Sequence, residues 1–98
     1  MLRFADIELN PTTRKVTRGE RSLALTPREF ELLRVLLEQP RRVFSKRALV
    51  ERVWGYDFAG DDNIVEVYIG YLRDKLADRP PTQLIRTVRG VGYALSDE

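Results

Sequence analysis

The chain has 98 residues, a net charge of +2, and neither cysteine nor histidine. This length suits one domain with a single hydrophobic core. Without cysteine the chain can form no disulfide and has no thiol nucleophile. Without histidine it lacks the commonest general base, and without both residues it lacks most ligands of transition metals. The composition therefore argues against an enzyme and predicts no cofactor. No segment resembles a signal peptide or reaches the roughly 20 apolar residues that span a bilayer, which predicts a cytoplasmic protein with no membrane contact.

Residues 1–25 alternate apolar and polar side chains in the manner of β-strands. The pair Asn10-Pro11 and the later Gly19 are turn-forming residues that interrupt this alternation. We therefore expect a small antiparallel sheet of about four short strands, with one buried face. The expected inward side chains are Leu2, Phe4, Ile7, Leu9, Val16, Leu23 and Leu25.

The next segment, TPREFELLRVLLEQP, has the features of a helix. Thr26 and Glu29 form the T-x-x-E pattern of a capping box, Pro27 occupies the first helical position, and Pro40 ends the segment. Its apolar residues surround most of the helix, which predicts the most buried helix of the domain.

A second, shorter helix is predicted over KRALVERVW, with Ser45 as its N-cap. Lys46 and Arg47 fall in its first turn, where cations are mildly unfavourable for the helix dipole. Two interpretations are open: the pair meets an anion that also contacts the helix N-terminus, or both are ordinary surface cations.

Gly55 ends this helix, and the loop YDFAG carries two aromatic residues that we expect to be exposed. A third helix follows within residues 61–78, where Asp61 and Asp62 are interpreted as helix capping. Helical spacing places Val65, Ile69, Leu72 and Leu76 on the core side. The opposite side presents Asn63, Glu66, Val67, Gly70, Tyr71, Arg73 and Asp74. An outward Val and Tyr flanking a Gly favour close contact with a partner surface.

The last segment, RTVRGVGY, places two glycines one residue apart. A phosphate-binding loop requires a helix after the glycines, and too few residues remain for one. Gly90 and Gly92 instead predict a C-terminal hairpin, in which they take positive φ and keep the tip narrow, with Arg89 near that tip.

The predicted order is a sheet over residues 1–25, three helices over 26–78 and a hairpin over 82–96, in a single α+β domain. A helix-turn-helix followed by a β-hairpin is the winged-helix arrangement of DNA-binding proteins, in which the hairpin is the wing. We expect the third helix to enter the major groove and the N-terminus of the second to abut a phosphate. Arg89 would reach the minor groove or the backbone.

Four motifs in this order, LTPREFELLRVLL, VFSKRALVERVWG, VEVYIGYLRDKL and IRTVRGVGYAL, resemble the C-terminal effector domain of the OmpR/PhoB family of two-component response regulators. The resemblance covers nearly the whole chain. It implies a winged-helix transcription factor that binds double-stranded DNA at direct or inverted half-sites as a weak homodimer. It also implies a receiver domain outside these residues, a sensor kinase and a contact with RNA polymerase, so we expect the chain to be a fragment of a longer regulator.

The resemblance also assigns residues. It places Asn63, Ile64, Val67, Tyr68, Gly70 and Tyr71 near bases, and Arg73 and Trp54 on the backbone. It assigns wing contacts to Thr87, Arg89 and Tyr93. The loop from Gly55 to Asp61, with Tyr56, Asp57 and Phe58, matches the segment through which some members touch RNA polymerase.

The third helix departs from several relatives, which have basic residues where this chain has Gly70 and Tyr71. Base readout would then depend on Asn63, Tyr71 and apolar contacts with thymine methyl groups. The acidic third helix also leaves open an alternative function, a winged-helix module that docks onto another protein. An enzyme would need paired carboxylates in a cleft, and the remaining acidic pair, Asp97 and Glu98, is typical of a polar tail.

Overall fold

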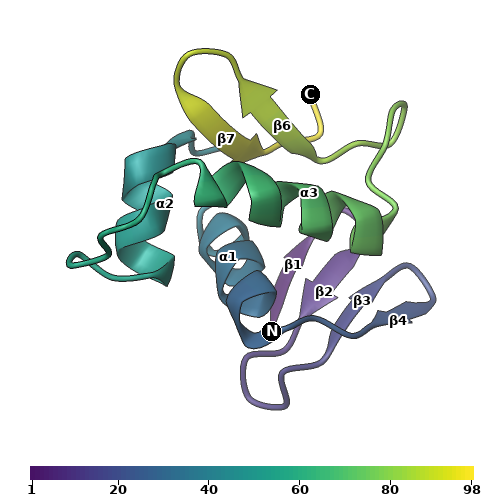
Figure 1. The fold of residues 1–98 in the computed structure, drawn as a ribbon. Helices are drawn as coiled ribbons and strands as arrows, with labels where there is room; N and C mark the ends of the chain where they lie inside the picture. Colours follow the sequence, from purple (N-terminus) through teal and green to yellow (C-terminus); the bar gives the residue numbers. More distant parts are fainter.

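The computed structural model describes all residues 1–98 and contains three helices and two antiparallel sheets. This confirms the predicted winged-helix class. The four-stranded sheet and the wing lie at opposite ends of the molecule, with α1 between them (Figure 1). In chain order the elements are β1 (Leu2–Phe4), β2 (Ile7–Leu9), β3 (Val16–Arg18), β4 (Arg21–Leu23), α1 (Pro27–Glu38), β5 (Phe44–Ser45), α2 (Lys46–Val53), α3 (Ile64–Leu76), β6 (Ile85–Val88) and β7 (Gly92–Leu95).

The N-terminal sheet is an antiparallel meander of four three-residue strands, as the alternation predicts. In the turn after β2, the side-chain oxygen of Asn10 accepts hydrogen bonds from the backbone N–H groups of Thr12 and Thr13. One face of the sheet packs on the core through its most buried side chains, Phe4, Ile7, Leu9 and Val16.

Helix α1 begins at the predicted capping box. The Thr26 hydroxyl accepts from the Glu29 N–H, and the Glu29 carboxylate accepts from the Thr26 N–H at 2.9 Å. The same carboxylate also accepts from Lys75 of α3 at 2.6 Å. Burial raises the pKa of Glu29, but the hydrogen bonds from Lys75 and Thr26 outweigh burial and hold this pKa below its ordinary value.

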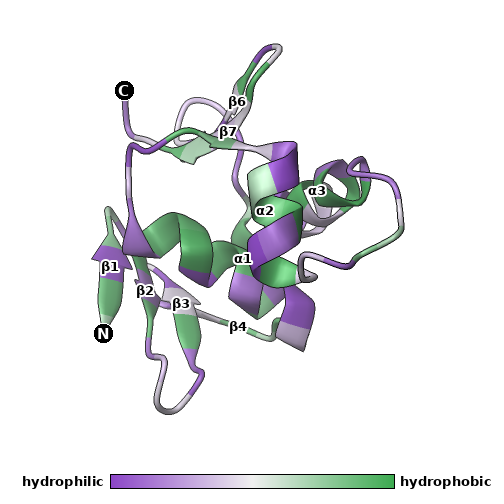
Figure 2. Ribbon diagram, turned by 90° about the vertical axis from the view of Figure 1, so that its left-hand side faces the viewer, coloured by the Kyte–Doolittle hydropathy of each residue, from purple (hydrophilic) through white to green (hydrophobic).

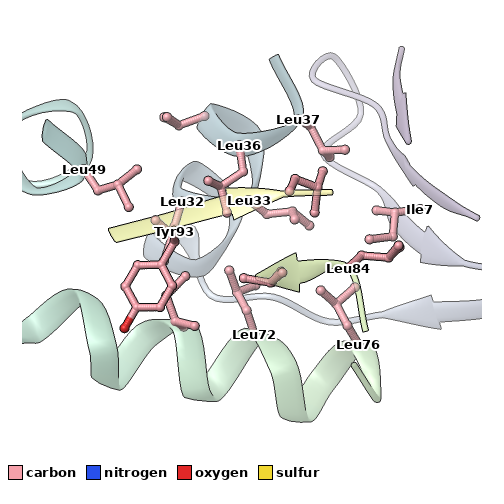
Figure 3. Packing of buried hydrophobic residues seen from close by; sticks show 14 of the residues in the cluster. Ile7, Leu32, Leu33, Leu36, Leu37, Leu49, Leu72, Leu76, Leu84 and Tyr93 are labelled. Carbon is pink, nitrogen blue, oxygen red and sulfur yellow. The ribbon is translucent and has the colours of Figure 1, made fainter. Parts of the chain in front are cut away.

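Figure 2 shows hydrophobic residues along much of α1, which the sheet and the other two helices surround. This confirms the predicted central helix: Phe30, Leu32, Leu33 and Leu36 are all at most 2% exposed. Figure 3 shows the leucines of α1 facing Leu72 and Leu76 of α3, with side chains of the wing between them. None of the three helices has the length and apolar character needed to cross a bilayer.

Helix α3 begins later than the acidic pair suggested. Its N-cap is Asn63, which makes no side-chain capping hydrogen bond. The interpretation as helix caps was wrong for Asp62, which pairs with Arg47 of α2. Asp61 does make a capping contact in the turn that leads into the helix, because its carboxylate accepts from the Asn63 N–H two residues on. The core side of α3 is as predicted, with Val65, Ile69, Leu72 and Leu76 buried.

The wing contains a strand that the sequence did not predict. β5 pairs with β7 in register Phe44 to Tyr93, which makes a three-stranded sheet of order β5-β7-β6. Two residues are too short to show any alternation, so no local signal marks β5. This strand joins the wing to the start of α2, because Ser45 both ends β5 and caps that helix.

A buried ion pair connects the two ends of the domain. Arg18 of β3 is 9% exposed and donates to the carboxylate of Asp78, which is 1% exposed, at 2.8 Å. Its guanidinium also donates to the backbone oxygens of Leu76 and Thr82. The Asp78 carboxylate accepts in addition from two backbone N–H groups at the start of the wing.

We expect Asp78→Ala to lower the free energy of unfolding by about 3–5 kcal/mol, because it leaves two backbone N–H groups without an acceptor and removes the buried carboxylate from Arg18, which keeps only the more exposed Asp6 as an ion-pair partner. Urea unfolding followed by circular dichroism measures this loss. Asp74→Ala is the matched control, since the Asp74–Arg79 pair is exposed and such pairs contribute at most about 1 kcal/mol. Equal effects of the two substitutions would show that the buried pair has no special structural role.

Candidate nucleic-acid interface

The turn between α2 and α3 brings the N-termini of these helices together. Ser45 caps α2 by accepting from the Ala48 N–H at 3.0 Å. The helix ends at Val53 with Trp54 as its C-cap, and Gly55 continues the chain with a φ of +109°. In the loop, Tyr56 is exposed, but Phe58 is half-buried and packs 6.1 Å from the Trp54 ring. The expectation of two exposed aromatics was therefore wrong for Phe58, because the loop folds back onto α2.

Lys46 and Arg47 are both paired with acidic side chains. The Lys46 ammonium donates to Glu66 of α3 at 2.6 Å and to the Asn63 side chain at 3.0 Å. The Arg47 guanidinium contacts Asp62 and Glu51, each at 3.2 Å. The hydrogen bond to Glu66 raises the pKa of Lys46, and those to Asp62 and Glu51 raise the pKa of Arg47, so both remain cations.

The outward side of α3 is apolar at its centre. Val67 is 45% exposed and Tyr71 is 47% exposed, with the partly exposed Gly70 between them in sequence. The Tyr71 ring stands edge-on to Tyr68 at 5.3 Å, and Tyr68 stands edge-on to Trp54 at 5.2 Å. Packing of each ring on the next restrains the orientation of the Tyr71 side chain.

Arg73 attaches the wing to α3. One of its terminal nitrogens donates to the Ile85 carbonyl at 2.8 Å and to the Thr87 hydroxyl at 2.9 Å. The guanidinium carbon lies 5.9 Å from the centre of the Tyr93 ring. The Arg73 Nε is buried without a hydrogen-bond partner. This arginine thus holds α3 and the wing at a fixed separation.

The wing tip is a tight turn. The Val91 N–H donates to the Val88 carbonyl at 2.9 Å, which leaves the exposed Arg89 and Gly90 at the end. Gly90 has a φ of +77°, as expected of a turn glycine. The prediction for Gly92 was wrong: it lies within β7, and its positive φ is absent. A Cβ atom there would overlap the Phe44 carbonyl, so this glycine lets β5 approach β7.

A hollow of about 290 Å³ separates the wing from the helix N-termini. Lys46 and Glu66 line it on the helix side, and Thr87, Gly90 and Tyr93 line it on the wing side. Tyr93 is only 7% exposed, with its hydroxyl turned toward α3 (Figure 3). Burial and the nearby Glu66 carboxylate raise the pKa of Tyr93, which keeps its hydroxyl protonated at neutral pH.

The residues predicted for DNA contact therefore differ in accessibility. Asn63, Val67, Tyr71, Thr87 and Arg89 are exposed. Lys46, Trp54, Ile64, Tyr68, Gly70 and Arg73 are partly buried, Arg47 is exposed but paired, and Tyr93 is buried. The sequence reasoning did not assign a role to Glu66, because its pairing with a cation 20 residues away has no local signature.

Comparison with known proteins identifies the family. The model of the family described as "Transcriptional regulatory protein, C terminal" matches residues 19–95. The chain belongs to this family. The resemblance to OmpR/PhoB-type C-terminal domains is thereby confirmed, and these domains regulate transcription rather than catalyse a reaction.

Two relatives are the response regulators MprA of Mycolicibacterium vanbaalenii, 50% identical over 94 residues, and of Mycobacterium tuberculosis H37Rv, 49% identical over 96 residues. The alignments cover 96% and 98% of this chain but only 41% and 42% of those proteins. The chain thus spans about two fifths of their length.

Two solved structures have the same fold. The Klebsiella pneumoniae RstA DNA-binding domain, solved in complex with the RstA box, is 30% identical with a TM-score of 0.87, covering 99% of this chain and 97% of that one. The AdeR DNA-binding domain, solved in complex with an intercistronic region, is 27% identical with a TM-score of 0.86, covering 98% and 99%. The fold of this chain is therefore shared with two domains that were solved in complex with DNA.

Within this family fold, we expect Gly92→Ala to lower the free energy of unfolding by about 1–3 kcal/mol, because β5 must move away from the added methyl group. Gly70→Ala is the matched control: its Cβ would meet open space in mid-helix, so it should stabilise the domain by about 0.5–1 kcal/mol. Urea unfolding of both variants measures the difference. A Gly92→Ala domain as stable as the wild type would contradict the close approach of the two strands.

Proposed function

We propose that this domain binds double-stranded DNA in a sequence-specific manner, as the output domain of a response regulator that controls transcription. In this proposal α3 enters the major groove and the wing lies over the adjacent minor groove or backbone. The observation that supports it best is the outward surface of α3, where exposed Val67 and Tyr71 flank Gly70. A helix without bulky charges at its centre can approach base edges closely.

The proposed contacts divide into two kinds. Asn63 and Tyr71 supply polar groups for base edges, and Val67 supplies apolar contact for thymine methyl groups. Arg89 at the wing tip and Lys46 at the N-terminus of α2 supply charge for phosphates, which position the protein but carry no sequence information. Arg73 is placed as a positioning residue, since its guanidinium already bonds to the wing.

We expect Arg89→Ala and Tyr71→Ala to weaken binding in different ways. Arg89→Ala should weaken binding to all duplexes about equally and reduce the salt slope by roughly one unit. Tyr71→Ala should cost about 1–3 kcal/mol at a selected site and leave affinity for random duplex nearly unchanged. The measurement is fluorescence anisotropy over a salt series, with a site selected from fragmented genomic DNA.

Arg3→Ala is the matched control, because Arg3 is an exposed arginine of β1, on the sheet opposite the wing. Arg3→Ala should leave both the duplex affinity and the salt slope at their wild-type values. If Arg89→Ala also behaves as the wild type, the wing does not contact DNA. Salt-independent binding to a protein partner, with no duplex binding, would support the docking module instead.

We further propose that two copies bind adjacent half-sites. The exposed surface of α3 offers few base-reading side chains, so one domain should bind weakly, and direct or inverted half-sites about one helical turn apart would combine two such contacts. Affinity measured by gel shift should be highest near one turn and fall when about five base pairs are inserted. Equal affinity at every spacing would show that the copies bind independently.

The resemblance to OmpR/PhoB response regulators implies further partners for the complete protein, namely a receiver domain, a sensor kinase and RNA polymerase. Tyr56 is 79% exposed in the loop between α2 and α3, and Asp57 is also exposed, so both are more available to the polymerase than the half-buried Phe58. Tyr56→Ala tests this contact independently of DNA binding. If Tyr56 contacts the polymerase, the substitution should lower the rate of transcription and leave the affinity for duplex DNA unchanged. Lowered duplex affinity would place the loop in the DNA interface.

A further inference from the structure

Two cations in the first turn of α2, where a phosphate is expected, already pair with carboxylates in the free domain. Lys46 lies 2.6 Å from Glu66, and Arg47 lies 3.2 Å from Asp62. Both carboxylates come from the start of α3 or the turn before it, so each pair links α2 to the segment that is proposed to enter the DNA. None of these four side chains is buried, and solvent or a ligand can reach all of them.

The Lys46–Glu66 pair lies in the hollow between the wing and the helices. A DNA backbone that runs between α3 and the wing would bring phosphates to this hollow. The ammonium of Lys46 already has two oxygen partners, from Glu66 and Asn63. A phosphate must therefore displace the Glu66 carboxylate or lie beside it, and two anions on one cation repel each other.

We propose that Glu66 and Asp62 act as intramolecular substitutes for DNA phosphate, which hold Lys46 and Arg47 in the free domain and release them when duplex DNA binds. This inference rests on the proposed function. It assigns the two acidic residues a role in setting affinity: they lower binding to any duplex, whatever its sequence. Stable binding then depends on base contacts and on a second copy of the domain.

Counterion release gives this exchange a measurable signature. A free lysine that binds a phosphate releases about 0.9 of a condensed cation into solution. When Lys46 leaves Glu66, however, the freed carboxylate attracts a cation in return, which offsets that release. The wild-type domain should therefore show a shallower salt dependence than its number of phosphate-contacting cations indicates.

The test measures affinity for a random-sequence duplex over a salt series. Glu66→Gln should bind about two- to fivefold more tightly than the wild type at low salt, with a salt slope steeper by up to about 0.9. Asp62→Asn should act in the same direction, although Arg47 keeps Glu51 as a partner. Glu8→Gln is the matched control: it makes the same charge change on β2, where Glu8 pairs with Arg3, and should change neither quantity by a comparable amount.

A double-mutant cycle tests the exchange itself. If Glu66 acts through Lys46, then Glu66→Gln should have little effect in a Lys46→Gln background. An equal gain in duplex affinity in the wild-type and Lys46→Gln backgrounds would overturn the exchange, because it would show that Glu66 repels DNA directly. Unchanged or weakened binding by Glu66→Gln alone would also overturn it. Absence of duplex binding by the wild type and all variants would instead refute the proposed function.

Discussion

The buried contact between Arg18 and Asp78 determines how the two ends of the domain fit together. Arg18 belongs to the N-terminal sheet, whereas Asp78 follows α3 and accepts hydrogen bonds from the first residues of the wing. A buried charge must be paired, so the sheet, the end of α3 and the start of the wing have one compatible arrangement. The sheet thus supports the proposed DNA-binding surface without forming part of it. Arg73, in the last turn of α3, has a corresponding role, because it bonds to the Ile85 carbonyl and the Thr87 hydroxyl of the wing strand β6.

Local features of the sequence predicted the elements well. Thr26 and Glu29 form the capping box that their spacing indicates, and helical periodicity assigned the buried side of α3 correctly. Such features involve residues three or four positions apart, and their energetics depend little on the rest of the chain. The resemblance to OmpR/PhoB-type domains then supplied the arrangement of these elements, which the family match confirms.

Most of the features that the sequence did not predict involve distant residues. Arg18 and Asp78 are 60 positions apart, and each is an ordinary surface residue by type. Gly92 looked like a turn residue because β5, the strand it must approach, was not predicted. Lys46 and Arg47 were recognised as unusual at the start of a helix, but the acidic residues that hold them come from the next helix and its turn. Charge at a position can be read from a sequence, whereas its pairing requires the fold.

This pairing bears on the apparent conflict between a DNA-binding fold and the acidic segment 61–78, which contains α3. A net charge of +2 is small for a protein that must approach a polyanion. The attraction that a DNA phosphate experiences, however, depends on where each cation lies and on whether a carboxylate already neutralises that cation. On this domain the acidic residues lie beside the cations of α2, while Val67, Gly70 and Tyr71 leave the centre of the outward α3 surface uncharged. In the proposed complex, attraction to the backbone and contact with the bases would therefore lie on different parts of one surface, so affinity and specificity could vary independently.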